Sequence, residues 1–394
     1  MTDEPKSSTH ASVPPWRDVR VLSIAFQVIV LVAVLVVGGF LLNNALTAME
    51  RQGFFPSLDF LGSTARFDIA NPLIPYEASD TIGKALLVGL LSTLMVSFVA
   101  VILATVIGLF VGIARLSGNW LISRLALGFV ELFRNTPLLL QLIVIYFGIL
   151  QLPGPKEAIA LPGSIFISKS GLDMPLAQLT GTGGLWLLSV VVAVAAVVAL
   201  WIVAGRRERA GRRTRGLRTL AVVLLFAAPL LAWLVFAQPP VSFQIPELGR
   251  FNFSGGIAIS AEFAALTLGL ALYTAAFIAE IVRGGIESVT TGQVEAARAI
   301  GLREGQTLRL VVLPQALRVI IPPLTSQYLN LIKNSSLALV IGFQDVFGIS
   351  ATISTNTGQP VSVLVVVMAF YLAISLIVSA LMNIYNRRVQ ITER

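Results

Sequence analysis

Long apolar runs separated by short polar segments make up most of this chain, and they predict helices that cross a membrane. About eight such runs occur, each long enough to span the hydrocarbon core of a bilayer as a helix. They lie at about residues 21–42, 85–114, 125–150, 185–204, 220–237, 257–282, 317–342 and 361–384. The first run is too long and begins too far into the chain for a typical cleaved signal peptide, so we interpret it as a membrane helix.

The second run carries a small residue at every fourth position. Ala100, Ala104, Gly108 and Gly112 fall on one face of the predicted helix. Because lipid removes the hydrophobic drive for association, membrane helices pack where small side chains let their backbones approach. The pattern predicts a neighbouring helix on this face.

The composition of the chain supports lipid as its main solvent. Of its 394 residues, 56% are hydrophobic and 12% are charged, and the mean hydropathy is +0.86. A soluble domain cannot bury this proportion of apolar side chains. Cysteine is absent and the one histidine, His10, lies in a polar tail. These counts argue against a thiol, metal or histidine-based enzyme, and we expect no metal site and no catalytic residues.

The net charge of +8 comes from basic residues that lie between the apolar runs. Threading the eight runs with the amino terminus inside places Arg134 and Lys333 within the membrane and most other basic residues on the inner side. Six fall outside: Arg51, Arg66, Lys84, Lys156, Lys169 and Arg250. This asymmetry predicts that both termini are cytoplasmic. The arginine-rich segment 205–218 has no interleaved aromatic residues, so we interpret it as a cytoplasmic anchor rather than a nucleic-acid site.

A polar segment, residues 284–314, separates the sixth and seventh runs and lies on the predicted cytoplasmic side. Thr290 and Gln293 stand at capping-box spacing, which predicts the start of a short helix. Gly301 predicts its end, because glycine readily takes the left-handed conformation. A second short helix follows, with its apolar residues at helical spacing, and Pro314 is expected to end it. The apolar residues of this second helix are Leu308, Val311 and Val312.

The residues of this segment resemble the EAA loop of ABC-importer permeases. The match is Glu295-Ala296-Ala297, then Gly301, then Leu313-Pro314, with Val311 where isoleucine is commoner. In that family the two short helices dock on a cytoplasmic ATPase. The resemblance therefore implies an ATPase-coupling role for eight residues: Gly292, Gln293, Glu295, Ala296, Ala297, Gly301, Leu313 and Pro314. The alternative is an amphipathic hairpin that rests on lipid headgroups.

Other segments resemble the polar amino-acid subfamily, the histidine and glutamine type. They are residues 131–141 (ELFRNTPLLLQ), 273–285, 313–318 and 333–337 (KNSSL). Residues 151–257 resemble the additional region of the longer permease subunit in general L-amino-acid importers. The resemblance implies an all-α, polytopic membrane protein with the type I ABC-importer (MetI-like) permease fold.

Charged residues within the membrane raise the question of a transport pathway. Glu131 and Arg134 are three residues apart and are expected to pair, either structurally or functionally, and Glu280 and Arg283 are expected to pair likewise. Lys333 is expected to face a cavity or a partner, because a lone charge in lipid is costly. Its ammonium would be able to receive the carboxylate of an amino acid. The candidate pathway residues are Arg134, Thr136, Gln141, Lys333, Asn334, Ser335 and Ser336.

These observations predict six regions. They are a cytoplasmic tail (1–20), a first membrane helix with an external loop (21–84), a first core part (85–150), an inserted region with two membrane helices around a basic cytoplasmic loop (151–257), a second core part containing the coupling loop (258–386), and a second cytoplasmic tail (387–394).

The resemblance implies the permease subunit of a bacterial inner-membrane importer for polar L-amino acids. The chain has no phosphate-binding loop, so ATP is expected on partner subunits and no cofactor on this chain. The implied partners are a second permease subunit, two ATP-binding subunits, an external substrate-binding protein and the lipid bilayer, with no nucleic acid. The alternatives are an ion-coupled secondary amino-acid transporter, an intramembrane enzyme and a structural scaffold.

Overall fold

The fold is mostly helical, with one group of short strands. The computed structural model describes residues 19–51, 58–209, 214–235, 239 and 241–389, so both predicted tails and the middle of the arginine-rich segment lie largely outside the described residues. The helices are α1 (Val19–Arg51), α2 (Ile82–Arg115), α3 (Trp120–Asn135), α4 (Leu138–Leu150), α5 (Gly183–Arg209), α6 (Arg215–Val235), α7 (Ala261–Glu287), α8 (Thr291–Ala299), α9 (Glu304–Thr307), α10 (Leu313–Asn334), α11 (Val346–Thr357) and α12 (Pro360–Val389).

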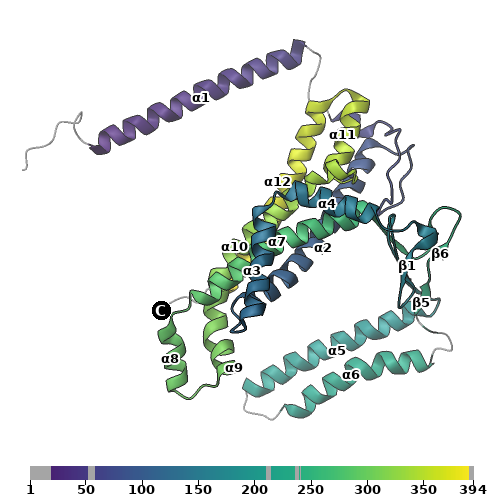
Figure 1. Ribbon diagram of the computed structural model, residues 1–394, viewed down its shortest axis with the longest axis vertical. Helices are drawn as coiled ribbons and strands as arrows, with labels where there is room; N and C mark the ends of the chain where they lie inside the picture. The colour runs from purple at the N-terminus through teal and green to yellow at the C-terminus, as the bar shows by residue number, and fades with distance from the viewer. Residues whose placement is uncertain (1–18, 52–57, 210–213, 236–238, 240, 390–394) are drawn as a thin grey trace, which may run out of the picture.

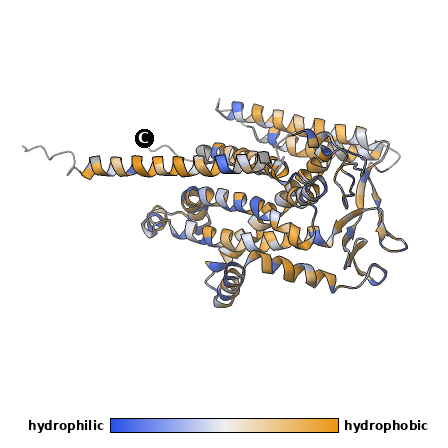
Figure 2. Cartoon of the chain, turned by 90° about the horizontal axis from the view of Figure 1, so that it is seen from above, coloured by the Kyte–Doolittle hydropathy of each residue, from blue (hydrophilic) through white to orange (hydrophobic). Residues whose placement is uncertain are grey.

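Six of the described helical segments are long and apolar enough to cross a membrane, or seven if a bent pair counts as one span. This agrees with the predicted polytopic membrane protein of about eight spans. The predicted run at 220–237 is helical as α6, whose apolar part within the described residues is Gly216–Ala227. Figure 2 shows that the long helices consist of apolar residues along most of their length.

The third predicted run is not one continuous helix, and this prediction was wrong. It divides into α3 and α4, whose axes differ in direction by 106°. Thr136 is extended, with φ −104° and ψ 138°, and Pro137 begins the next helix. A residue before proline is driven out of the helical region by its contact with the proline ring, so the break falls at this peptide.

Residues 151–184, predicted as a loop, contain strands β1 to β4, and strands β5 to β8 follow at residues 241–260. The strands are β1 (Ile159–Leu161), β2 (Ile165–Ser168), β3 (Gly171–Met174), β4 (Leu176–Leu179), β5 (Val241–Gln244), β6 (Glu247–Leu248), β7 (Phe253–Ser254) and β8 (Ile257–Ser260). They form an antiparallel sheet in the order β1-β2-β3-β8 and two smaller pairs, β4-β5 and β6-β7. The sixth run therefore begins at Ala261 rather than 257, and the Ser260 side chain caps α7.

The centre of the molecule is α7, which packs against α2, α3, α4 and α10. The small-residue face of α2 lies on α7, as the sequence predicts, and all four of its residues are buried. A Cβ added to Gly108 would lie 2.6 Å from Cβ of Ile278, closer than two carbon atoms can approach. Glycine is required at this crossing because the two backbones meet there.

A short helix, α11, follows the seventh run and was not predicted from the sequence. It begins at Asp345, whose Oδ1 accepts a hydrogen bond from the Gly348 N–H at 2.8 Å. The Val346 N–H donates to Oγ1 of Thr93 in α2 at 3.1 Å. The second bond fastens the start of α11 to α2 at Thr93, so the two helices are joined by a polar contact as well as by packing.

Candidate functional site

The segment between α7 and α10 forms a helical hairpin at one end of the molecule (Figure 1). Helix α8 ends in a Schellman motif, in which the Leu302 N–H donates to Ala297 O at 3.1 Å and the Gly301 N–H donates to Arg298 O at 2.9 Å. Gly301 has φ +84°, which confirms the predicted stop. We call residues 290–313 the coupling segment from here on.

The predicted capping box at the start of α8 does not form as expected. Thr290 is the N-cap residue, but its side chain makes no capping hydrogen bond, and the Gln293 N–H donates to the Thr290 carbonyl at 3.0 Å. A corresponding contact occurs instead at α9, where the Arg303 N–H donates to Oε1 of Gln306 at 2.9 Å. Of the two short helices, α9 is therefore the one whose start is fixed by a hydrogen bond from a backbone N–H to a side chain.

Pro314 does not end the second helix, and that prediction was wrong. Residues Leu308–Val312 form a π-helical turn (η3) that runs directly into α10. The Leu313 N–H donates to the carbonyl of Leu308, five residues earlier. This wider turn lets the chain continue through a proline, which has no N–H to donate and would clash with the carbonyl of a tight α-turn. The coupling segment is thus continuous with α10.

The predicted coupling residues are mostly exposed. Of the eight, Ala297 is buried, Pro314 is half-buried, and the other six are exposed. Two apolar side chains that the sequence did not single out are among the most exposed here, Ile300 at 78% and Leu310 at 61%. Ile300 directly precedes Gly301, and Leu310 lies within η3, four residues before Pro314. The segment therefore presents apolar side chains outward at the end of the molecule, which is the arrangement expected of a surface that docks on another protein.

An ion cluster fixes the end of α7 from which the coupling segment starts. Glu280 pairs with Arg115 of α2 at 3.1 Å and with Arg283, and Arg283 also pairs with Glu287. The predicted Glu280–Arg283 pair is therefore present within a larger network. The side chains of Arg115, Glu280 and Arg283 are 17–28% exposed. The network therefore joins the end of α7 next to the coupling segment to α2.

Arg134 and Glu131 do not pair, contrary to the prediction. Among the described ion pairs none joins them, and Oε2 of Glu131 accepts a hydrogen bond from the amide of Asn135 at 2.8 Å. The Arg134 guanidinium lies over the Phe277 ring, 5.3 Å from its centroid. This cation–π contact brings Arg134 from α3 onto α7.

Thr136 and Gln141 act together at the break between α3 and α4. The Gln141 amide nitrogen donates to the carbonyl of Phe133 at 2.9 Å and to the carbonyl and hydroxyl of Thr136 at 3.0 and 2.8 Å. Gln141 is buried. Carbonyls left without partners by the break are satisfied in this way, so these two candidate pathway residues have a structural role.

A polar cleft of about 260 Å³ lies between α7 and α10. It is lined by Tyr273, Thr274, Phe277, Gln327, Asn330 and Asn334. Asn334 is the predicted pathway residue that lines it, and Arg134 reaches its edge through Phe277. Gln327 and Asn330 were not predicted, although the successive spacings of three and four residues between Gln327, Asn330 and Asn334 place them on one helix face.

The other predicted pathway residues lie elsewhere. The side chain of Lys333 is exposed, and no hydrogen bond or ion pair joins it to a described residue. The Ser335 hydroxyl is buried and donates to the Ile332 carbonyl at 2.8 Å, while the Ser336 hydroxyl donates to the Lys333 carbonyl at 2.9 Å. The two serines close the last turn of α10, and only Asn334 of the four consecutive candidates faces the cleft.

A larger cavity, of about 720 Å³, lies at the opposite end of the core from the coupling segment. It is mostly apolar and includes two acidic residues, Asp68 and Glu262. Oε1 of Glu262 accepts a hydrogen bond from the Tyr146 hydroxyl at 3.1 Å. The Gln344 amide joins the external loop here, accepting from the Ala70 N–H at 2.6 Å. Sequence analysis missed this cavity because its walls come from five separate parts of the chain.

Comparison with known proteins gives a consistent set of relatives. Residues 201–391 match the family model described as "Binding-protein-dependent transport system inner membrane component". The chain is 45% identical over 94% of both chains to YhdX of Escherichia coli (strain K12), which is assigned as an amino-acid ABC transporter permease. It is 40% identical over the full length of both chains to the general L-amino acid transport system permease AapQ of Rhizobium johnstonii. It is 39% identical, over 100% of this chain and 99% of the relative, to the glutamate/glutamine/aspartate/asparagine transport permease BztB of Rhodobacter capsulatus.

Proposed function

Since the chain belongs to the family of amino-acid ABC transporter permeases, we propose that it forms half of the membrane channel of an importer for polar L-amino acids. The partners in this proposal are a second, similar permease, two ATP-binding subunits and an external substrate-binding protein. The complex would lie in the bacterial inner membrane, with the coupling segment and both termini of this chain in the cytoplasm. ATP would bind and be hydrolysed on the partner subunits.

One observation carries the proposal, namely the exposed hairpin of the coupling segment built onto two core helices. Three residues separate the start of α8 from the end of α7, and η3 continues without interruption into α10. In the core, Ile320 and Ala316 of α10 belong to the same apolar cluster as Ile278 and Val282 of α7. A force applied to the hairpin would therefore move both helices of the polar cleft.

The mechanism that we propose follows from this connection. Closure of an ATPase dimer would push the coupling segment, and the core would change between an inward-open and an outward-open packing. Each ligand, ATP inside and the loaded binding protein outside, would favour one of two states. Hydrolysis would return the core to the inward-open state and release the amino acid.

The proposed substrate class rests on the relatives and on the chemistry of the cleft. AapQ and BztB are named for general L-amino acids and for glutamate, glutamine, aspartate and asparagine. The cleft offers amide and hydroxyl groups from Gln327, Asn330 and Thr274, which both donate and accept hydrogen bonds. Such groups suit polar side chains of either charge state, so we expect a broad preference for polar amino acids.

The ion-coupled alternative is weaker on this structure. A secondary transporter needs an acidic group at membrane depth to carry the proton or hold the ion. The buried acidic residues among the described ones are Asp173 and Asp345, and both lie outside the candidate spans. The broken helix α3–α4 is a feature that such transporters also have, but Thr136 and Gln141 satisfy its break with neutral groups.

A reconstitution experiment tests the proposal. The chain would be co-expressed with the permease, ATP-binding and binding-protein subunits encoded with it, purified by a tag on this chain, and assayed for ATP hydrolysis in nanodiscs. We expect the ATP-binding subunits to co-purify, and hydrolysis to rise when binding protein and a polar amino acid are added together. Amino-acid uptake by the chain alone, driven by an ion gradient without ATP, would contradict the proposal.

A further inference from the structure

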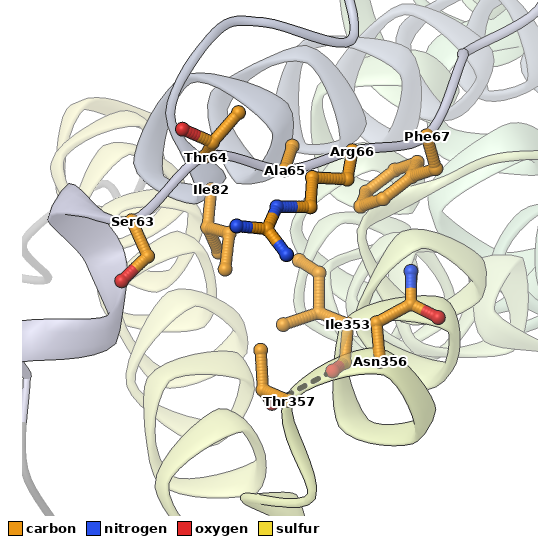
Figure 3. A pocket seen from close by; sticks show the side chains of 9 residues that line it. All are labelled: Ser63, Thr64, Ala65, Arg66, Phe67, Ile82, Ile353, Asn356 and Thr357. Carbon is orange, nitrogen blue, oxygen red and sulfur yellow. Dashed lines mark hydrogen bonds between the residues drawn. The ribbon is translucent and has the colours of Figure 1, made fainter.

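A second outer cavity, of about 490 Å³, lies between the external loop and the end of α11 (Figure 3). It is at the end of the core opposite to α8 and α9 (Figure 1). The lining residues are Ser63, Thr64, Ala65, Arg66, Phe67, Ile82, Ile353, Asn356 and Thr357. No feature of the proposed transport mechanism uses this cavity.

Arg66 is held in an unfavourable backbone conformation at the rim of the cavity. Its φ is +61°, in the left-handed region that residues with a Cβ seldom occupy. Two hydrogen bonds fix the segment on which it lies, from the Arg66 N–H to Ala78 O at 2.9 Å and from the Ala65 N–H to Asp80 O at 2.8 Å. Figure 3 shows the guanidinium extending over the cavity between Ile82 and Ile353. The strained backbone thus directs the charged group into the hollow.

The guanidinium has no partner among the described residues, since no hydrogen bond or ion pair joins it to any of them. The lining contains no carboxylate. Asp80, whose carbonyl accepts from the Ala65 N–H, is already engaged through its side chain, because that carboxylate accepts from Nζ of Lys84 at 2.7 Å and from the Glu77 N–H at 2.9 Å. Arg66 therefore offers its full set of donors to a group from outside.

The other polar groups of the cavity indicate which kind of ligand would bind there. Ser63 and Thr64 have exposed side chains, and Asn356 supplies an exposed amide, while Ile82 and Ile353 form a buried apolar floor. The arrangement suits a carboxylate that accepts two parallel hydrogen bonds from the guanidinium. A free amino acid also carries an ammonium, and the lining has no acidic group to receive it. The charge pattern therefore favours a carboxylate carried by a protein side chain.

We propose that Arg66, with Ser63, Thr64 and Asn356, is a docking site for an aspartate or glutamate side chain of the external substrate-binding protein. This inference rests on the proposed function, which supplies that partner. The site lies on the end of the molecule from which the binding protein would approach. Binding of the carboxylate would join the external loop to α11, and α11 is fastened to α2 through Thr93 and Val346.

The test uses the complete transporter in nanodiscs and the binding protein that stimulates its ATPase activity. The variants are Arg66→Gly, which removes the guanidinium but tolerates the φ of +61°, and Arg66→Glu, which reverses the charge. Arg250→Gln is the matched control, because Arg250 is also predicted to lie outside and contacts its own neighbour, the Phe251 ring, at 5.2 Å. The affinity of the binding protein is measured for each variant at low and high salt.

We expect the affinity to fall about tenfold in Arg66→Gly and further in Arg66→Glu, and its salt dependence to weaken in both. Thermal stability and basal ATPase activity should stay at the level of the Arg250→Gln control. Wild-type affinity in both Arg66 variants would overturn the docking site while leaving the proposed function intact. Absence of stimulation of the wild-type complex by any binding protein would overturn both. Binding of free labelled glutamate to the complex without binding protein, lost in Arg66→Gly, would overturn the protein partner in favour of a small molecule.

Discussion

The helix pair α2–α7 and the hairpin α5–α6 show two ways of building a membrane helix pair from one sequence. In α7, 67% of the apolar window is buried inside the protein, against 11% in α5. Both pairs use small residues at their contact. The buried hydrophobic residues of the hairpin are Ala193, Ala204 and Ala221, and those of the α2 face are Ala100 and Ala104 with two glycines.

The difference lies in what surrounds each contact. Helix α7 meets other helices on most of its circumference, so α2 cannot shift without disturbing α3, α4 and α10. Helix α5 packs mainly on α6, and its remaining surface is open to lipid or to a partner. Equal substitutions should therefore have unequal consequences in the two regions, and the first two of four predictions test this.

The largest effect is expected from a side chain added at the α2–α7 crossing. In Gly108→Val the new Cβ would lie 2.6 Å from Cβ of Ile278 and 2.9 Å from the Ala275 carbonyl. Overpacking of this kind should lower the free energy of unfolding by about 3 kcal/mol or more. The matched control, Gly205→Val in α5, meets no atom within 4 Å and should change stability little. Thermal unfolding in detergent measures both, and equal losses would contradict the comparison.

A smaller effect is expected when an ion-paired glutamate is neutralised in each region. Glu280→Gln removes the pairs with Arg115 and Arg283 in a site where all three side chains are less than a third exposed, so we expect a loss of about 2 kcal/mol. Glu208→Gln removes the Glu208–Arg218 pair, whose side chains are 44% and 52% exposed, and should cost less than about 0.5 kcal/mol. Unfolding measured at low and high salt separates the two. A larger loss for Glu208→Gln would be inconsistent with this account.

A local effect is expected at the elbow of the coupling segment. In Gly301→Val the φ of +84° becomes strained, at a cost of about 1–2 kcal/mol confined to α8 and α9. Gly305→Val, four residues away in open space with ordinary φ, is the control. We expect the Gly301 variant to insert in the membrane and bind ATP-binding subunits weakly, with uptake reduced, while the control behaves as wild type. Normal uptake in Gly301→Val would show that the elbow does not transmit force.

The smallest effect is a pH dependence from two buried acids outside both helix pairs, Asp345 at the start of α11 and Asp173 in β3. Burial raises the pKa of Asp345 from 3.8 to about 6, and burial also raises the pKa of Asp173 in β3. Because the folded-state pKa is the higher one, the stabilising effect of the protonated acid is fully present below the unfolded pKa of 3.8. It is lost as the pH rises through about 6, on the order of 1 kcal/mol between pH 5 and 7 for Asp345.

Asp345→Asn should reduce the pH dependence of the free energy of unfolding between pH 5 and 7, since asparagine also caps a helix but does not titrate. Asp173→Asn should flatten it less, because β3 belongs to the peripheral sheet rather than the core. Unfolding across pH 4–8 gives the result. If the free energy of unfolding of Asp345→Asn depended on pH as in the wild type, the carboxyl of Asp345 would be ionised across this pH range.

Much of the fold could be predicted where the information is local. The apolar runs gave the membrane helices, the four-residue repeat of small residues gave the α2 face that packs on α7, and Gly301 gave the end of α8. Each depends on a few neighbouring residues, so periodicity and glycine chemistry suffice.

The errors arose where distant segments meet or where one apolar run hides a break. Strand β3 pairs with β8 across the whole α5–α6 hairpin, and Arg115 pairs with Glu280, 165 residues away. No local pattern encodes such pairings. The break at Thr136-Pro137 did carry a local signal, since proline restricts the residue before it, but the continuous apolar character outweighed that signal in the prediction. For the candidate pathway, chemistry alone grouped Lys333 with Asn334, whereas the structure separates them.

Site-specific cross-linking tests the central claim, that residues 290–313 dock on an ATP-binding subunit. The chain contains no cysteine, so single substitutions label one place only. Ile300→Cys would lie at the most exposed apolar position of the coupling segment, and Asn356→Cys at the opposite end of the core. In the purified complex, a cysteine-reactive photo-cross-linker on position 300 should capture the ATP-binding subunit, whereas one on position 356 should not. Capture from position 356, or none from position 300 in a complex that hydrolyses ATP, would contradict the account.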